Sequence, residues 1–335
     1  MKNFNTFNYE LENLRNTKPI LAFDGSIPLT EWKVRAREKL TELLGLPFQK
    51  CDPDFEIEYK KEFDEFTEYR FTVQTETDYY VPCHLLIPKG VKIPTPLTID
   101  LMGHGGGMHL ALGRAKTEAD EKSLSEWSHR AMALRAISEK RCALVIEARS
   151  FGEASVNGYG TSCTEAAKIA IIMGRTTIGE RVWDVMRVLD AVESNFSEVD
   201  MQGIVCTGNS GGGTATYYLA ALDERIAYAA PCCSVCTYAD SIAAIEHCLC
   251  NHIPSIRKHF EMGDLAGLIA PRKLIVAAGK RDTIFPIDGV KGAYKQIEFI
   301  YKSANCAENC ALVIGDNGHY NYADLIWEKL HQMGV

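Results

Sequence analysis

Gly208-Asn209-Ser210-Gly211-Gly212 follows a short apolar run, residues 204–207, and precedes a helix-forming stretch that extends to Leu222. A G-x-S-x-G sequence between a strand and a helix is typical of a nucleophile elbow, a sharp turn that holds the serine hydroxyl above the edge of a sheet. Gly208 and Gly212 fill the two places where backbone approaches backbone too closely for a Cβ. A glycine-rich turn that happens to contain a serine is the alternative, but the flanking strand and helix favour the elbow.

The composition is that of an ordinary globular protein. The chain has 335 residues, of which 46% are hydrophobic and 24% charged, and this is enough for one large α/β domain. The formal net charge of −8 argues against nucleic acid or an anionic membrane as the main partner, because both require a basic face. No apolar run has the length of a membrane span, and residues 1–8 lack the layout of a signal peptide. We therefore expect a cytoplasmic protein, and the sequence leaves a homo-oligomer open.

Short apolar segments alternate with helical ones from residue 97 onward. Strands are predicted over residues 97–102, 142–146, 204–207, 226–233, 273–278 and 311–314, and an amphipathic helix over residues 180–194. Such alternation predicts a mostly parallel sheet covered by helices on both faces. Two alternating β-forming segments precede it, residues 66–73 and 79–87, and predict an antiparallel entry to the sheet in which Pro82 indicates an edge strand.

The N-terminal part has a different residue pattern from the rest of the chain. Residues 1–25 are polar, and we expect them to be irregular or partly helical. A helix is predicted over residues 31–44, because Ala36, Leu40 and their apolar neighbours share one face. Thr30 is the expected N-cap, and Gly45, with a proline two residues later, is the expected end.

Two residues that follow predicted strands are candidates for the acid and the base that act with the serine. A serine hydroxyl needs a base to take its proton, and the usual base is a histidine oriented by a carboxylate. Asp282 follows the strand at 273–278, and His319 follows the strand at 311–314. The order Ser210, Asp282, His319 is the chain order of the triad in α/β-hydrolases. Asp288 is the alternative acid, and the alternative bases, which follow strands less closely, are His247, His252 and His259.

Gly103-His104-Gly105-Gly106-Gly107 follows the strand at 97–102 and offers backbone N–H groups at the same sheet edge. In hydrolases with an elbow, one oxyanion donor is the residue after the serine and another comes from a loop at this place. We therefore expect the oxyanion hole to be formed by Gly211 together with His104 or Gly105. A phosphate-binding loop is the alternative, but the stretch matches neither G-x-x-x-x-G-K-[S/T] nor G-x-G-x-x-G.

From about residue 66 to the C-terminus these features resemble the α/β-hydrolase superfamily. Within it, the chain is similar to the dienelactone-hydrolase-like branch that includes acetyl xylan esterases, on the evidence of residues 103–106, 149–153, 222–226 and 270–273. It departs from related deacetylases at Met102, where histidine is usual, and at Tyr320, where glutamate is usual.

The resemblance implies an α/β-hydrolase fold and serine ester hydrolysis through an acyl-enzyme, without cofactor or metal. It implies a small ester, such as an acetylated carbohydrate, as substrate. We expect a single domain, residues 1–335, with a helical extension at 1–54 and a catalytic core at 55–335. A serine peptidase of the same fold and a non-catalytic binding protein of that fold are the alternatives.

Twelve cysteines raise the question of disulfide bonds or metal, and free thiols are expected because residues 1–8 do not have the pattern of a signal peptide. Cys232, Cys233 and Cys236 lie near a second group in the sequence, formed by His247, Cys248, Cys250 and His252. Zinc sites use such residues, but the spacing is not that of paired C-x₂-C motifs, so ordinary thiols are favoured. Arg149, at a strand end, is expected to form a structural ion pair with Asp184 or Glu147 rather than to bind substrate.

Overall fold

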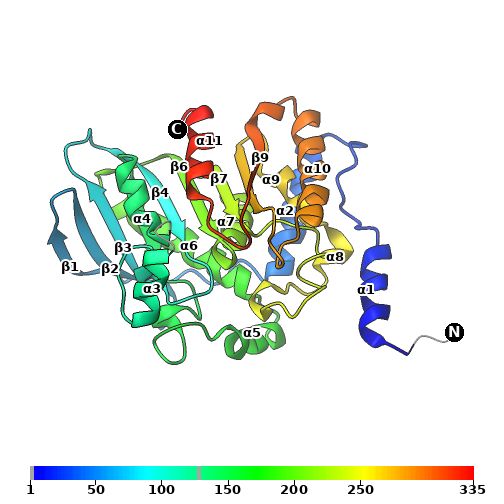
Figure 1. Cartoon of the computed structure of the whole chain (residues 1–335), viewed down its shortest axis with the longest axis horizontal. Helices are drawn as coiled ribbons and strands as arrows, with labels where there is room; N and C mark the ends of the chain where they lie inside the picture. Colours follow the sequence, from blue (N-terminus) through cyan, green and yellow to red (C-terminus); the bar gives the residue numbers. More distant parts are fainter. Residues whose placement is uncertain (1–3, 127–129) are drawn as a thin grey trace.

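The structure is a computed structural model that describes residues 4–126 and 130–335. It contains a nine-stranded sheet with the order β1-β2-β3-β5-β4-β6-β7-β8-β9. The pairs β1–β2, β2–β3 and β3–β5 are antiparallel, and every pair from β5 to β9 is parallel. The predicted mostly parallel sheet with an antiparallel entry is therefore confirmed, and Figure 1 shows the antiparallel strands at one end of the molecule.

The strands differ in how deeply they are buried. They are β1 (Glu56–Glu62), β2 (Phe66–Glu76), β3 (Tyr79–Pro88), β4 (Thr95–Leu101), β5 (Cys142–Ile146), β6 (Val199–Asn209), β7 (Ile226–Cys232), β8 (Lys273–Gly279) and β9 (Cys310–Gly315). All five residues of β5 are buried, as expected for a strand covered on both faces. Every residue of β1 is exposed, so the sheet ends on a polar strand rich in charges, which discourages pairing with other chains.

Pro82 does not lie on an edge strand, so this prediction is wrong. It belongs to β3, which pairs with β2 on one side and with β5 on the other. The β3–β5 ladder ends at Cys83, and Pro82 lies one residue beyond it. Glu147 N still donates to Pro82 O at 3.1 Å, so the proline costs only the reciprocal bond at the end of the ladder, and the strand tolerates it without being at the edge.

Helices cover both faces of the sheet. The α-helices are α1 (Thr6–Asn16), α2 (Leu29–Leu44), α3 (Glu118–Glu126), α4 (Met132–Ser138), α5 (Cys163–Ile172), α6 (Thr177–Asn195), α7 (Gly211–Leu222), α8 (Ile256–His259), α9 (Ala266–Ile269), α10 (Ile287–Ser303) and α11 (Ala323–Gln332). Short 3₁₀ helices are η1 (Met108–Leu110), η3 (Gly152–Ala154), η4 (Leu249–Asn251), η5 (Met262–Leu265) and η6 (Ala307–Asn309). Leu144 and Val145, which are neighbours on β5, belong to two different apolar clusters, so the clusters lie on opposite faces. One cluster contains α2, α6, α7 and α10, and the other contains α4 and α11.

The two N-terminal helices contribute unequally to this core. α2 begins at Leu29, after Pro28, so Thr30 is not its N-cap; its C-cap is Gly45 with φ 77°, as the sequence predicts. Trp32 and Leu40 of α2 are buried in the larger cluster, and the Trp32 indole donates to Leu21 O at 2.9 Å. α1 has no buried residue and lies at the side of the molecule (Figure 1).

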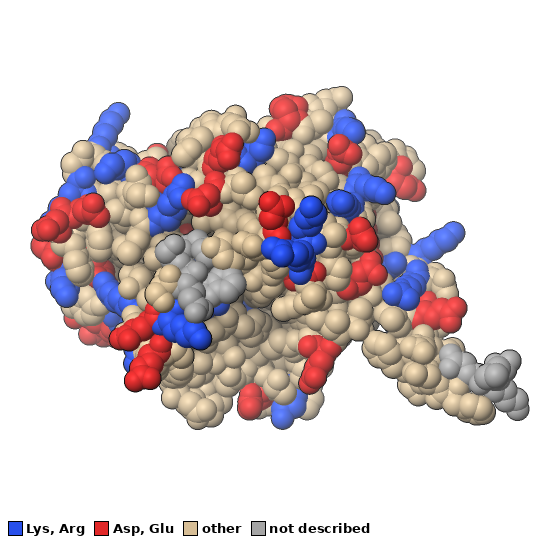
Figure 2. Space-filling view, viewed as in Figure 1, with Lys and Arg blue, Asp and Glu red and all other residues tan. Residues whose placement is uncertain are grey.

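The surface carries charges of both signs. Figure 2 shows acidic and basic side chains interspersed over one face of the molecule, without a broad patch of one sign on that face. Among the described residues, no helix combines the length and the apolar character that crossing a bilayer requires.

Candidate active site

Ser210 occupies a strained turn between β6 and α7. Its φ of 55° and ψ of −121° are unusual for a residue with a side chain, and its N–H donates to Cys232 O at 2.9 Å. A Cβ on Gly208 would lie 2.4 Å from Gly212 O, and one on Gly212 would lie 1.9 Å from Leu101 O. Both glycines are therefore required by close backbone approach, which is the elbow geometry that the motif predicts.

Asp282 and His319 form a hydrogen-bonded pair at the ends of β8 and β9. His319 Nδ1 lies 2.8 Å from Asp282 Oδ2, and Asp282 Oδ1 accepts from the N–H groups of Ile284 and Phe285 at 2.8 and 3.1 Å. Burial raises the pKa of Asp282, but the hydrogen bond and charge of His319 and the two backbone donors outweigh it, so the pKa lies below its usual value. An ionised carboxylate only accepts, so Nδ1 carries the proton and Nε2 is left as a base.

Ser210 and His319 line the same cavity, whose volume is about 400 Å³. Its other lining residues are His104, Arg130, Asn209, Ile245, Glu246, His247, Cys248, Ile284, Tyr320 and Asn321. A larger cavity of about 480 Å³ lies between α1 and residues 238–258, but neither Ser210 nor His319 lines it, so size alone does not mark the reactive site.

The alternative acid and bases are placed less favourably. Asp288 lies in the first turn of α10. His247 lines the cavity, but its Nδ1 lies 3.3 Å from Asn251 Nδ2, and no carboxylate partner is found for it among residues 4–126 and 130–335. The structure thus brings together Ser210, Asp282 and His319, the three residues that the sequence order favours.

The expected oxyanion donors lie beside the elbow. Gly211 is the first residue of α7, where backbone N–H groups have no partner within the helix and the helix dipole is positive. Gly103 packs on the serine, since its Cβ would lie 3.0 Å from Ser210 Cβ. His104 is the next residue, and its ring lies 3.1 Å from the position that a Cβ on Gly211 would take. Gly105 lies against the side chain of Arg130.

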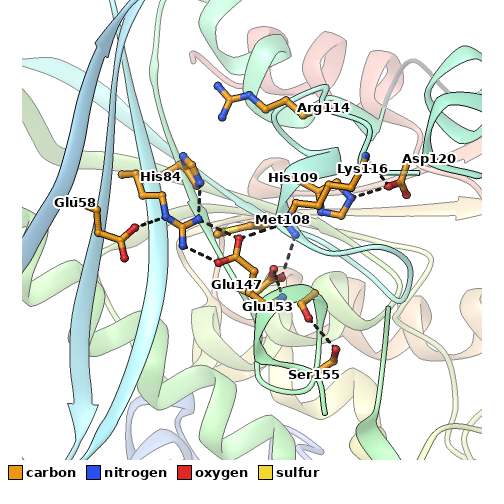
Figure 3. Close-up of polar contacts among 12 residues, drawn as sticks. Glu58, His84, Met108, His109, Arg114, Lys116, Asp120, Glu147, Glu153 and Ser155 are labelled. Atoms are coloured by element: carbon orange, nitrogen blue, oxygen red, sulfur yellow. Dashed lines mark hydrogen bonds and ion pairs between the residues drawn. The ribbon is translucent and has the colours of Figure 1, made fainter. Parts of the chain in front are cut away.

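Glu147 joins this loop to the next one, and sequence reasoning missed it. Its carboxylate accepts from Met108 N at 3.0 Å and from Glu153 N at 3.1 Å, and Figure 3 shows these contacts. Gly107 and Gly152 have φ of 130° and 44°, and a Cβ on Gly107 would lie 2.6 Å from Gly152 Cα. Burial raises the pKa of Glu147 to about 7 against the effect of the two donors. The feature of the sequence that points to Glu147 is its place directly after the buried strand β5.

Arg149 has the structural role that the sequence predicts. Its guanidinium donates to both carboxylate oxygens of Asp184 at 2.7 and 2.8 Å and lies 4.1 Å from the centre of the Tyr79 ring. Asp184, not Glu147, is therefore a partner, and Glu76 Oε1 is a second one, at 2.6 Å. A buried guanidinium paired in this way stabilises the packing of the 149–153 loop against α6.

The cysteines group differently from the sequence expectation. Cys248 and Cys250 gather with His104 and Cys163, and the four potential ligand atoms all lie within 4.8 Å of one another. Cys232 and Cys233 contact Tyr320 O instead, at 3.3 and 3.2 Å, and take no part in this cluster. Sequence reasoning missed His104 and Cys163 because they come from segments distant from the Cys248-x-Cys250 pair.

The sheet, the elbow and the ordered acid and base define the class of protein, an α/β-hydrolase. The sequence matches the model of the Abhydrolase family over residues 5–302, and the chain belongs to that family. This match begins well before residue 66, so the N-terminal helices are part of the family's shared sequence. The chain is also 26% identical over 248 residues to YtaP of Bacillus subtilis, to which hydrolase activity is attributed, covering 72% of this chain and 79% of that one.

Solved structures with the same fold extend over nearly the whole chain. A Bacteroides fragilis protein to which acetyl xylan esterase activity is attributed has a TM-score of 0.83 at 17% identity, covering 99% of this chain and 96% of that chain. A glucuronoyl esterase from Solibacter usitatus has a TM-score of 0.69 at 14% identity, covering 95% and 98%. An acetyl xylan esterase from Paenibacillus sp. R4 has a TM-score of 0.61 at 18% identity, covering 96% and 98%. At these identities the likeness shows the fold.

Proposed function

We propose that the protein is a serine carboxylic-ester hydrolase that acts through an acyl-enzyme. The observation that carries the proposal is the hydrogen bond between buried Asp282 and His319, beside a cavity that Ser210 also lines. A serine on a strained elbow, a histidine and a carboxylate that orients it are the parts that acyl transfer requires.

Each residue then has one role. His319 takes the proton of Ser210 Oγ as this oxygen attacks the ester carbonyl, and Asp282 stabilises the resulting imidazolium. The N–H of Gly211 and those of the Gly103–Gly107 loop stabilise the oxyanion. His319 next protonates the leaving alcohol, and a water molecule, activated by the same histidine, releases the acid. These steps use side chains, backbone and water, without a cofactor.

The substrate class that we propose is a small carbohydrate ester, such as a sugar acetate. The names of the similar solved structures, acetyl xylan esterase and glucuronoyl esterase, support it. So does the lining of the cavity, where Arg130, Glu246 and Asn321 offer polar groups to a hydroxyl-rich alcohol. We also propose the cytoplasm as the compartment, because none of the twelve cysteines forms a disulfide bond and a reducing environment keeps cysteines in that state.

Replacement of the nucleophile tests the mechanism. Ser210→Ala should lower kcat/KM for a small aryl acetate by at least about 10⁴-fold, with an unchanged thermal unfolding transition. Ser150→Ala is a matched control, because Ser150 also has a positive φ, 68°, in the loop that follows β5, and it should keep full activity. Full activity of Ser210→Ala would refute the assignment.

Two further measurements separate the alternatives. A fluorophosphonate should label Ser210 in the wild type; a protein that is neither labelled nor active on any ester would be a non-catalytic binding protein. A panel of acetylated xylo-oligosaccharides, aryl esters and peptide anilides should give turnover of the esters. Cleavage of the peptides without ester hydrolysis would instead indicate a serine peptidase of this fold.

A further inference from the structure

Four residues with metal-binding side chains converge next to the elbow. They are His104 in the loop after β4, Cys163 at the first position of α5, and Cys248 and Cys250 at η4. Their ligand atoms all lie within 4.8 Å of one another; Cys163 and Cys250 are buried, and His104 and Cys248 are half-buried. One imidazole and three thiols from three separate segments form the donor set of a Cys₃His zinc site.

The distances to the imidazole fit a single ion at the centre. His104 Nε2 lies 3.5 Å from Cys163 Sγ and 3.4 Å from Cys250 Sγ. Bonds of about 2.3 Å to sulfur and about 2.0 Å to nitrogen at tetrahedral angles separate the two ligand atoms by about 3.5 Å. Nε2 carries either one proton or one lone pair, so it cannot make two good hydrogen bonds at once. A shared ion accounts for both approaches.

Arg181 provides an independent indication that the sulfurs are thiolates. It is 2% exposed, and its guanidinium donates to Cys163 Sγ at 3.4 Å and lies 4.2 Å from the centre of the Phe151 ring. The guanidinium also donates to Arg149 O at 2.8 Å, but within the described part of the chain its Nη1 has no hydrogen-bond partner and no carboxylate forms an ion pair with it. A buried cation requires a compensating anion. Three thiolates around one Zn²⁺ carry one net negative charge, which matches the charge of the guanidinium.

We propose that His104, Cys163, Cys248 and Cys250 bind one structural Zn²⁺ ion. Four protein ligands complete a tetrahedral coordination, so no position remains for water and the ion does not act as the hydrolytic catalyst. Because it holds the His104 ring, the ion fixes the Gly103–Gly107 loop against α5 and η4, and two of its ligands, His104 and Cys248, line the cavity. The metal site stands independently of the proposed ester hydrolysis.

A disulfide bond is the chemical alternative for this cluster. It would join two of the three cysteines and release two protons and two electrons to an oxidant. It would leave the third sulfur and the His104 nitrogen without a reason to converge, and it would remove the anions that compensate Arg181. The zinc site accounts for all five groups together.

The experiment measures metal directly. The wild type, produced with zinc in the medium and a reductant, is desalted over a chelating resin and analysed by plasma mass spectrometry. We expect about one zinc ion per chain, and at least about tenfold less in Cys163→Ser and Cys250→Ser. Cys236→Ser is the matched control, a buried cysteine whose Sγ contacts Pro286 O, and it should keep its zinc.

A second readout keeps the proposal testable if the variants fold poorly. Wild type reconstituted with Co²⁺ should show the intense visible absorption of tetrahedral thiolate coordination, and Zn²⁺ should displace it. Less than about one-tenth of a zinc ion per wild-type chain, even after titration with excess Zn²⁺, would overturn the proposal. So would full zinc content in both ligand variants, or a disulfide among these cysteines in the protein as isolated under reductant.

Discussion

The two walls beside Ser210 are built in different ways. On one side, Asp282 and His319 follow directly from neighbouring strands, and the parallel register of β8 with β9 runs unbroken from Leu274–Cys310 to Gly279–Gly315. On the other side, the partners of His104 lie 59 and 146 residues away and come from α5 and η4. The first wall is positioned by the sheet, whereas the second depends on how irregular segments pack.

The two walls therefore differ in how rigidly they hold their side chains. A sheet edge is rigid, so a hydrogen bond of 2.8 Å between Asp282 and His319 can be kept ready without help from a ligand. Loops and a 3₁₀ turn have few backbone hydrogen bonds of their own and need another constraint to hold a shape. The proposed zinc ion would supply that constraint for the second wall.

The largest effect on activity is expected from a substitution in the first wall, which Asp282 and His319 form. Asp282→Asn should lower kcat for an aryl acetate by about 10⁴-fold, because an amide that donates to His319 favours the wrong tautomer. The zinc content should stay at the wild-type value, measured by plasma mass spectrometry. Asp288→Asn is the matched control, since this acid lies in the first turn of α10, and it should retain activity. Loss of zinc together with activity would show that the two walls are not independent.

Sequence analysis reached the first wall because its signals are local. A strand, a G-x-S-x-G turn and a helix lie next to one another in the chain, and Asp282 and His319 each follow an apolar run. The strand at Cys142–Ile146 was predicted to the residue, because a continuous apolar segment of this length has few alternatives. Thr30 and Pro82 were misjudged, because capping and edge position depend on neighbours that the local sequence does not specify.

The second wall could not be predicted in the same manner. The sequence draws attention to Cys248 and Cys250, but the nearest cysteines in the chain, Cys232 and Cys233, lie against Tyr320 instead. The sequence predicts a role for the backbone of His104, as an oxyanion donor, and indicates no partner for its ring. For Glu147 it suggests only an ion pair with Arg149. These roles follow from packing between distant loops, which no local pattern encodes.

An intermediate effect is expected where the Gly103–Gly107 loop of the second wall packs against the loop after β5. Gly107→Ala places a Cβ 2.6 Å from Gly152 Cα and 2.9 Å from Glu147 Oε2, at a φ of 130° that side chains rarely adopt. We expect a loss of about 2–3 kcal/mol in the free energy of unfolding, because backbone must shift. Displacement of the oxyanion loop should lower kcat by about 10²-fold, measured on an aryl acetate.

Gly90→Ala is the control that separates the effect of a strained backbone from the effect of moving the Gly103–Gly107 loop. Gly90 also has a positive φ, 71°, but a Cβ there would meet nothing within 4 Å. This control should lose about 1 kcal/mol in stability and keep its kcat. Equal kcat in the two variants would mean that the Gly107 loop contributes nothing to the reaction.

The smallest effect on activity is expected from Asp100, on β4, the strand that leads into the Gly103–Gly107 loop of the second wall. Its carboxylate is 1% exposed and has no hydrogen-bond partner within the described residues. Burial raises its pKa to about 8, only partly offset by the charge of Arg141. The unfolded chain therefore loses this proton first, and the stability of the wild type falls as pH rises from about 4 through about 8.

Asp100→Asn removes that titration without changing the shape of the side chain. At pH 9 the variant should be more stable than the wild type by a few kcal/mol, and the difference should shrink toward pH 5, as measured by urea unfolding. Activity at pH 7 and zinc content should not change, because Asp100 touches neither wall. Asp64→Asn, in the exposed turn between β1 and β2, is the control and should show no such pH dependence. A constant difference between wild type and Asp100→Asn from pH 5 to pH 9 would mean that the buried carboxylate does not titrate in this range.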